Sequence, residues 1–208
     1  MKTAPNPEKR EHEMTAPAFT DQKLSAEELA QARLLLQQTQ NAVVGATKGL
    51  SEAQWKFKPA PDRWSIAENV QHIVIVQERV LGPILDQLAS APAPSADVDP
   101  NAVDAIVINQ FSTRLNKFSA PEFIHPGEQI APSELLDRLS ANYARLADCL
   151  VSKPGLRQHA AEALPLKAVS NGAFSLMDGY QWILAAAAHT ERHTKQMLEV
   201  MADPGYPA

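Results

Sequence analysis

The sequence predicts an all-α protein, a four-helix bundle with one short extra helix and long connecting loops. Sixteen prolines stand against eight glycines in 208 residues, and the prolines leave several long gaps. Because proline lacks a backbone donor and disfavours helix at the preceding residue, uninterrupted helices are expected only inside these gaps. Apolar residues recur there every three to four positions, the spacing of an amphipathic helix. Four long segments of this kind and one short one make a helical bundle the expected architecture.

The first two helices are predicted from their capping signals. Ser25 and Glu28 have the spacing of a capping box, and leucines follow at helical spacing, so a helix is expected over 25–48. The same serine-to-glutamate spacing opens the second helix, which is rich in valine and isoleucine and is expected over 65–88. Within this second helix, Gly82-Pro83 predicts a kink.

The remaining helices are separated by two loops that are rich in proline. The expected order is a loop over 89–100, a short helix over 103–117, a loop over 120–132, a long helix over 133–153 and a last helix over 175–201. The hairpin-type dipeptide Asn171-Gly172 precedes this last helix and does not join two alternating runs, so the predicted fold class stays all-α.

These helices are expected to form a single domain over 21–203, preceded by a flexible tail over 1–20 and followed by a short tail over 204–208. The first twenty residues hold three prolines and six charges that balance, a composition typical of a mobile segment.

Composition and charge exclude several classes of protein. The 19 Lys+Arg and 24 Asp+Glu give a formal net charge of −5, which does not suit a protein that binds the nucleic-acid backbone. The longest apolar run, 182–188, is far shorter than the roughly 18 residues of a membrane span. Cys149 is the one cysteine, and the first thirty residues contain no stretch of signal-peptide type. We therefore expect a cytoplasmic protein that binds neither nucleic acid nor membrane.

Three of the six histidines fall at positions that suit a metal site. His72 lies in the middle of the predicted second helix, and His189 and His193 lie four residues apart on the last one. Four residues advance a helix by about 400°, so these two imidazoles lie nearly one above the other and reach the same ion. The alanines at 185–188 leave room beside them. Two ligands from one helix and one from another can build a metal site inside a bundle.

Each of these features also has a plain structural explanation. An isolated H-x-x-x-H pair on a helix is more often a surface pair or a hydrogen-bonded core pair than a metal site, and four alanines also fit close helix packing. His189 is followed by Thr190, and Glu191 points about 200° away from it. The sequence therefore does not match the H-E-x-x-H pattern of zinc proteases.

Other side chains are candidates for holding the histidine rings in place through hydrogen bonds, which fix the tautomer of a ligating imidazole. They are Asn69 and Glu68 near His72, and Asp178, Trp182 and Gln196 on the face of His189. Capping already explains Glu68, core packing explains Trp182, and a favourable charge in the first helical turn explains Asp178.

Three segments together resemble the DinB/YfiT-like superfamily of metal-dependent four-helix-bundle proteins. They are DRWSIAE at 62–68 followed by His72, APEFIHP at 120–126, and HTERHTKQ at 189–196. In that family a Trp-Ser-x-x-Glu segment leads into a helix whose histidine is the first metal ligand, and a late H-x-x-x-H supplies the other two. The resemblance covers about residues 24–202, and it implies that His72, His189 and His193 are metal ligands.

The resemblance further implies a divalent ion, most often zinc or nickel, with open positions for water or a substrate atom. Three neutral nitrogen ligands with an open position also fit a catalytic zinc on chemical grounds. Characterised relatives include S-transferases that use bacillithiol or mycothiol and a thiol-dependent maleylpyruvate isomerase. Homodimers are common in the family, and the resemblance extends that expectation to this chain.

We therefore expect a metal-dependent thiol S-transferase or hydrolase, whose ion activates a low-molecular-weight thiol or a water for attack on an electrophilic small molecule. No catalytic side chain and no thiol-cofactor motif is identified. The alternatives are a non-catalytic, stress-associated metal-binding protein and a helical interaction module whose three histidines are separated in space. Convergence of the ring nitrogens to about 3–4 Å would favour a shared ion, since its ligands lie about 2.0–2.1 Å from it.

Overall fold

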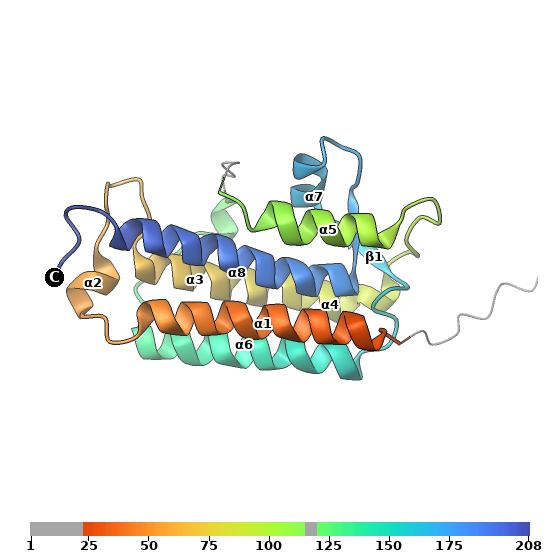
Figure 1. Cartoon of the computed structure of the whole chain (residues 1–208), viewed down its shortest axis with the longest axis horizontal. Helices are drawn as coiled ribbons and strands as arrows, with labels where there is room; N and C mark the ends of the chain where they lie inside the picture. The colour runs from red at the N-terminus through yellow and green to blue at the C-terminus, as the bar shows by residue number, and fades with distance from the viewer. Residues whose placement is uncertain (1–22, 115–119) are drawn as a thin grey trace, which may run out of the picture.

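The computed structural model describes residues 23–114 and 120–208, and it confirms the predicted four-helix bundle (Figure 1). The long helical segments are α1 (Ala26–Thr47), the continuous run of α3 (Ile66–Val76), a π-helical turn (Gln77–Leu81) and α4 (Gly82–Gln87), then α6 (Pro132–Ser152) and α8 (Gly179–Met201). The predicted flexible tail over 1–20 and the predicted end of the short helix at 115–117 lie outside the described residues.

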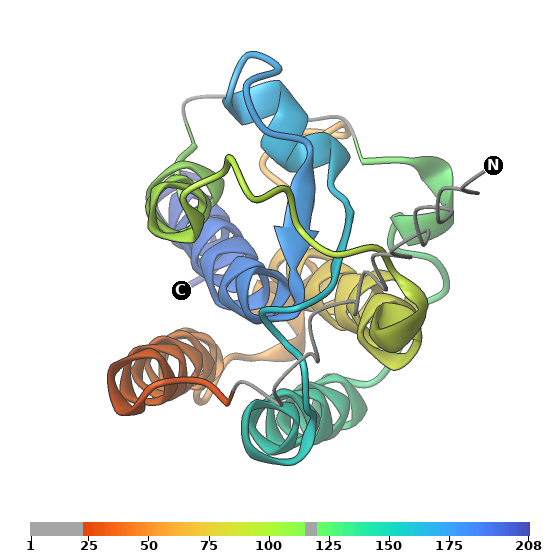
Figure 2. The same cartoon turned by 90° about the vertical axis from the view of Figure 1, so that its right-hand side faces the viewer.

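Neighbouring helices of the bundle run parallel in two pairs. Seen end-on, α1 lies beside α8 and α6, and the α3–α4 run lies between α6 and α8 (Figure 2). The ion pairs Glu78–Arg138 and Asp86–Arg145 follow the same order along both helical segments, so α3–α4 and α6 run in one direction. The starts of α1 and α8 lie at the same end of the bundle, so these two helices run the other way (Figure 1).

The predicted kink at Gly82-Pro83 takes the form of a π-helical turn. Pro83 has no N–H, and its ring would clash with the carbonyl of Arg79 in a regular α-helix. The turn over Gln77–Leu81 is wider, and in it the N–H of Gly82 bonds the carbonyl of Gln77. The helix then continues and ends in a 3-10 turn at Leu88–Ser90, close to the predicted end.

Short helices fill several of the connections. α2 (Glu52–Lys56) was not predicted, and it starts with a capping box between Ser51 and Gln54. α5 (Pro100–Phe111) begins three residues before the predicted start because Asp99 caps it, and it packs on the outer side of α8 (Figure 1). A 3-10 turn (Glu122–Ile124) lies within the predicted loop over 120–132.

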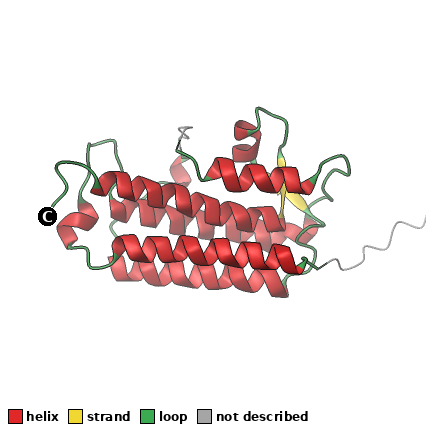
Figure 3. Ribbon diagram, viewed as in Figure 1, coloured by secondary structure: helices red, strands yellow, loops and turns green. Residues whose placement is uncertain are grey.

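A small antiparallel sheet adds to the helical fold (Figure 3). Strands β1 (Ala160–Glu162) and β2 (Leu176–Asp178) have three residues each, which is too short for an alternating pattern. Because residues 176–178 pair with β1, α8 begins at Gly179, and the predicted start near residue 175 is wrong. Between the strands lie α7 (Leu164–Val169) and the turn at Asn171-Gly172. The two residues of this turn, Asn171 and Gly172, have positive φ.

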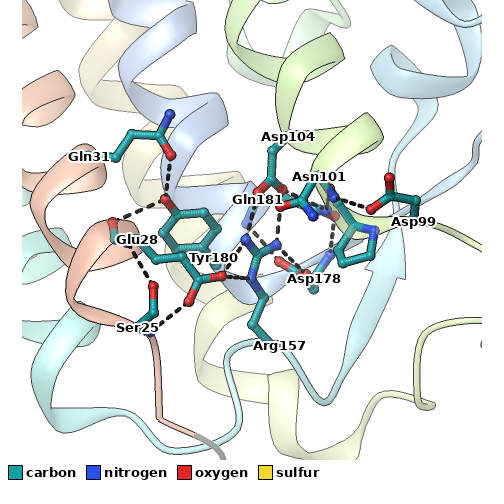
Figure 4. A network of polar contacts seen from close by, with 11 residues as sticks. Ser25, Glu28, Gln31, Asp99, Asn101, Asp104, Arg157, Asp178, Tyr180 and Gln181 are labelled. Carbon is teal, nitrogen blue, oxygen red and sulfur yellow. Dashed lines mark hydrogen bonds and ion pairs between the residues drawn. The ribbon is translucent and has the colours of Figure 1, made fainter.

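Arg157, in the loop after α6, ties the starts of α1, α5 and α8 together (Figure 4). Its guanidinium pairs with Glu28, Asp104 and Asp178 at 2.7, 2.6 and 2.9 Å. Burial disfavours the charged guanidinium, yet the carboxylates of Asp104 and Asp178 raise the pKa of Arg157 above its ordinary value. Because Asp178 also caps α8, this network fixes where the last helix begins.

The start of α8 packs closely against its neighbours at Gly179. A Cβ placed there would lie 2.3 Å from Cδ2 of Leu88 and 2.7 Å from Cδ2 of Leu156. Nonbonded carbon atoms prefer separations of about 3.5–4.0 Å, so no larger residue fits without movement.

No helix in the described part of the chain is both long and apolar enough to cross a membrane.

Substituting Gly179 is expected to destabilise the fold. Gly179→Ala should lower the free energy of unfolding by about 1–3 kcal/mol, because the added methyl group overpacks the contact with Leu88 and Leu156. Gly45 provides the control, since it is exposed in α1 and a Cβ there would meet nothing within 4 Å. Gly45→Ala should raise the free energy of unfolding by about 0.5–1 kcal/mol. Urea denaturation measures both, and a neutral Gly179→Ala would contradict the close packing.

Candidate metal centre

The candidate metal centre lies where α3 and α8 pack against each other in opposite directions (Figure 1). Asn69, near the start of α3, contacts His193, near the end of α8. This packing places His72 of α3 opposite His189 and His193. The structure therefore brings together the three histidines that the sequence singled out, which argues against the interaction-module alternative, because that alternative needs them apart.

The three imidazoles form a compact cluster. One ring nitrogen from each lies within 4.8 Å of the others. The ring centroids are 5.1 Å apart for His72 and His189, 4.6 Å for His72 and His193, and 4.5 Å for His189 and His193. Ligands of one ion lie about 3–4 Å apart, so sharing an ion needs at most a small inward movement of the rings. Among the described residues, no carboxylate or thiol belongs to this group.

Hydrogen bonds orient two of the three rings. Nδ1 of His72 donates to the backbone carbonyl of Ile124 at 2.8 Å, and Nδ1 of His193 donates to Oδ1 of Asn69 at 3.0 Å. Nδ2 of Asn69 donates to the carbonyl of Ser65, which turns Oδ1 of this amide toward His193. Because Nδ1 holds the proton in both rings, each Nε2 is left as an acceptor. Asn69 holds an imidazole as predicted, but the ring is that of His193 and not that of His72, near which it was expected to act.

Burial keeps the three imidazoles neutral. It lowers the pKa of His72 to about 4 and, together with the neighbouring His72 and Arg192, the pKa of His189 to about 3. The pKa of His193 falls well below its ordinary value for the same reason, with His189 and His72 adding to the effect. A metal ligand must be a neutral imidazole, so at neutral pH the cluster is already in the form that binds a cation.

Trp64 packs against the cluster from the capping segment of α3. Its ring centroid lies 4.7 Å from that of His72 and 5.9 Å from that of His193, with which it is stacked. His125 approaches the same indole edge-on at 6.1 Å. The three segments that carry the family resemblance, 62–68, 120–126 and 189–196, therefore meet in space at this centre.

The other side chains that were predicted to bond the histidine rings interact elsewhere. Glu68 caps α3 and pairs with Lys58. Gln196 accepts a hydrogen bond from Arg114. Asp178 caps α8 eleven residues before His189, about 16 Å along the helix, so its predicted contact with the ring is wrong. Trp182 is buried two turns from His189, and its indole N–H has no hydrogen-bond partner in the part of the chain that the structure describes.

Two arginines beside the centre were not anticipated from the sequence. In the sequence of α8, Arg192 comes between His189 and His193. Its side chain is buried and donates to the carbonyl of Thr113. Arg114 reaches α8 from the segment after α5, where it bonds Gln196 at 2.9 Å. Helical spacing contained the signal for Arg192, because it lies one turn from His189. The approach of Arg114 depends on the path of the chain after α5, which no local pattern records.

Removing the amide that orients His193 is expected to weaken metal binding. Asn69→Leu should lower the affinity for a divalent ion about 10–100-fold, the usual effect of losing a group that orients a ligand. Gln71→Leu is the matched control, because Gln71 is also buried in α3 but donates to the carbonyl of Glu128. Competition with a chromophoric chelator measures both affinities, and equal losses would contradict the role of Asn69.

The metal-free chain is expected to lose stability as the pH falls from 7 to 5. His72 titrates near pH 6.5 when unfolded and at about 4 when folded. In this window the unfolded chain binds a proton that the folded chain does not bind, so stability falls with pH. His72→Gln should therefore lose about 1–2 kcal/mol less over this range. Urea denaturation with chelator at both pH values is the measurement, and an equal loss in the two proteins would argue against a buried neutral ring.

Comparison with known proteins identifies relatives. The family model of the DinB superfamily matches residues 35–197. The chain is 25% identical over 154 residues to the uncharacterized protein YuaE of Bacillus subtilis (strain 168), an alignment that covers 74% of this chain and 86% of YuaE. YfiT from Bacillus subtilis, described as a probable metal-dependent hydrolase with an unusual four-helix bundle topology, matches with a TM-score of 0.57 and 12% identity over 92% of this chain and 94% of that chain.

The likeness to YfiT shows the fold alone at this identity. The family match is broader, because it spans more than half of the chain and includes all three clustered histidines. The chain therefore belongs to the DinB superfamily.

Proposed function

We propose that this chain is a metal-dependent enzyme in which His72, His189 and His193 hold one divalent ion, zinc or nickel. The ion would activate a low-molecular-weight thiol or a water for attack on an electrophilic small molecule. The observation that carries the proposal is that one ring nitrogen from each of the three buried imidazoles lies within 4.8 Å of the other two. The description of YfiT as a probable metal-dependent hydrolase supports this class of function.

The donor set fits a catalytic ion. Three neutral imidazoles leave the charge of a divalent ion uncompensated and a tetrahedral position open, as in catalytic zinc sites. When bound, such an ion lowers the pKa of a coordinated thiol or water and so supplies a nucleophile near neutral pH. Asn69 and the carbonyl of Ile124 hold two rings in the ligating tautomer, and Trp64 covers one side of the cluster.

We favour a thiol over water as the nucleophile. Among the described residues no carboxylate joins the imidazole cluster, and Glu191, the acid nearest in sequence, pairs with Lys195 at 2.7 Å. A thiol ionises near pH 8.5 before any metal binds, so it needs less help from a general base than water does. An S-transferase reaction therefore suits this site better than hydrolysis.

A cytoplasmic location and a homodimer belong to the same proposal and stay predictions.

Metal analysis tests the ligand set directly. After loading with Zn²⁺ or Ni²⁺ and desalting, the protein should hold about one ion per chain, and His189→Ala should hold none. His159→Ala is the control, because His159 bonds the carbonyl of Ala91 and lies outside the cluster. Mass spectrometry of the metal content gives the result, and full occupancy in His189→Ala would rule out the site.

Turnover separates the reaction classes. With monochlorobimane as a generic electrophile, an S-transferase should show consumption that needs both a small thiol and the ion, whereas a hydrolase should act on an activated ester without thiol. If chelation leaves both the fold and every turnover rate unchanged, the result supports the alternative of a non-catalytic metal-binding protein. If chelation melts the bundle, the ion has a structural role.

A further inference from the structure

One side of the histidine cluster, the side that faces α5, is lined by guanidinium groups. Along α8, Arg192 lies about 60° from His189 in the sense opposite to His193, which is the ring that contacts α3 through Asn69. Arg192 is buried, and it donates to the carbonyl of Thr113 just beyond the end of α5. Its guanidinium therefore lies between the histidine face of α8 and α5.

Arg192 and Arg114 together form a wall of guanidinium groups, in which Arg114 lies about one helical turn further along α8. It bonds Oε1 of Gln196, which lies about 20° from His189 on the same face of α8. Arg192 and Arg114 therefore both lie beside the face of α8 that carries His189.

Among the residues that the structure describes, this wall carries more guanidinium groups than carboxylates. Arg63 and Arg114 pair with a single carboxylate, that of Glu199, at 3.2 and 3.0 Å. Arg192 adds a third guanidinium to the same group, and Lys195 on the next face is matched by Glu191. Bonds to the carbonyls of Thr113 and Ser112, just beyond the end of α5, hold Arg192 and Lys195 in place, since cations favour a helix C-terminus.

We propose that Arg192 and Arg114 select a nucleophile or substrate that carries an anionic group next to the atom that reaches the metal centre. This inference rests on the proposed function, because it names the charge class of the molecule that the same site accepts. A guanidinium about 4–8 Å from a ligand charge attracts an anion and repels a cation, by enough to change affinity roughly tenfold or more at the effective dielectric constant of a protein surface.

Three small thiols of equal length test the charge class without relying on turnover. They are 2-mercaptoethanesulfonate, 2-mercaptoethanol and cysteamine, whose far ends are anionic, neutral and cationic. Binding to the Ni²⁺-loaded protein is followed by the thiolate-to-metal charge-transfer absorption. The expected order of affinity is sulfonate, then alcohol, then amine, with about a tenfold difference or more between the first and the last.

Variants assign the preference to the wall. Arg192→Gln keeps a donor for the carbonyl of Thr113 but removes the charge, so it should reduce the preference for the sulfonate over the amine about tenfold. Arg114→Gln should reduce it in the same direction, and it keeps the test decisive if Arg192→Gln does not fold. Lys195→Gln is the control, because Lys195 bonds the carbonyl of Ser112 from a face about 120° away from His189 and should leave the preference unchanged.

The outcomes are distinguishable. Absence of a charge-transfer band with all three thiols would overturn the preference for a thiol nucleophile and this inference together, and it would leave a metal site that activates water. Bands of equal strength and affinity for the three thiols would overturn the inference alone and leave a thiol-binding metal site. A preference for the anionic thiol that both arginine variants retain would also overturn it, because the ion itself would then be the source of the selectivity.

Discussion

The antiparallel packing of α3 against α8 is the contact on which the candidate site depends, because neither helix holds a full set of ligands. Small residues allow it: Gly179 meets Leu88 and Leu156 at one end, and the buried alanines at 185–188 keep α8 narrow in the middle. At the other end the bond between Asn69 and His193 sets the register. The π-helical turn after His72 lets the helix continue past Pro83 without losing this contact.

The same packing places polar groups where an apolar core would be expected. His72 and His193 are buried, and each uses Nδ1 for a hydrogen bond, so each second nitrogen remains an acceptor. A cation satisfies several acceptors at once, which is why a cluster of neutral imidazoles points to metal binding more strongly than any one buried histidine does.

Local patterns predicted the parts of this structure that local interactions determine. The capping boxes at Ser25 and Ser65 fixed two helix starts to within one residue, because each box involves only four consecutive positions. Helical periodicity placed His189 and His193 on one face and His72 in the middle of the second helix, and the family resemblance implied that all three are ligands. Strands β1 and β2 were not predicted, because their pairing joins segments that start sixteen residues apart and uses only three residues from each. Periodicity put Asp178 on the face of His189 but could not foresee that Arg157 would hold it at the far end.

Distance along α8 separates the elements that anchor the fold from those that set the chemistry. The carboxylates around Arg157 meet the helix at Asp178, about 16 Å before His189. At that separation the Coulomb energy is about a quarter of its value at 4 Å, and neutralisation by Arg157 weakens their field further. In our proposal, charges near the cluster decide which ligands it attracts, among them the guanidiniums of Arg192 and Arg114 and the carboxylate of Glu199. A negative net charge for the whole chain is thus compatible with a binding site that favours anions.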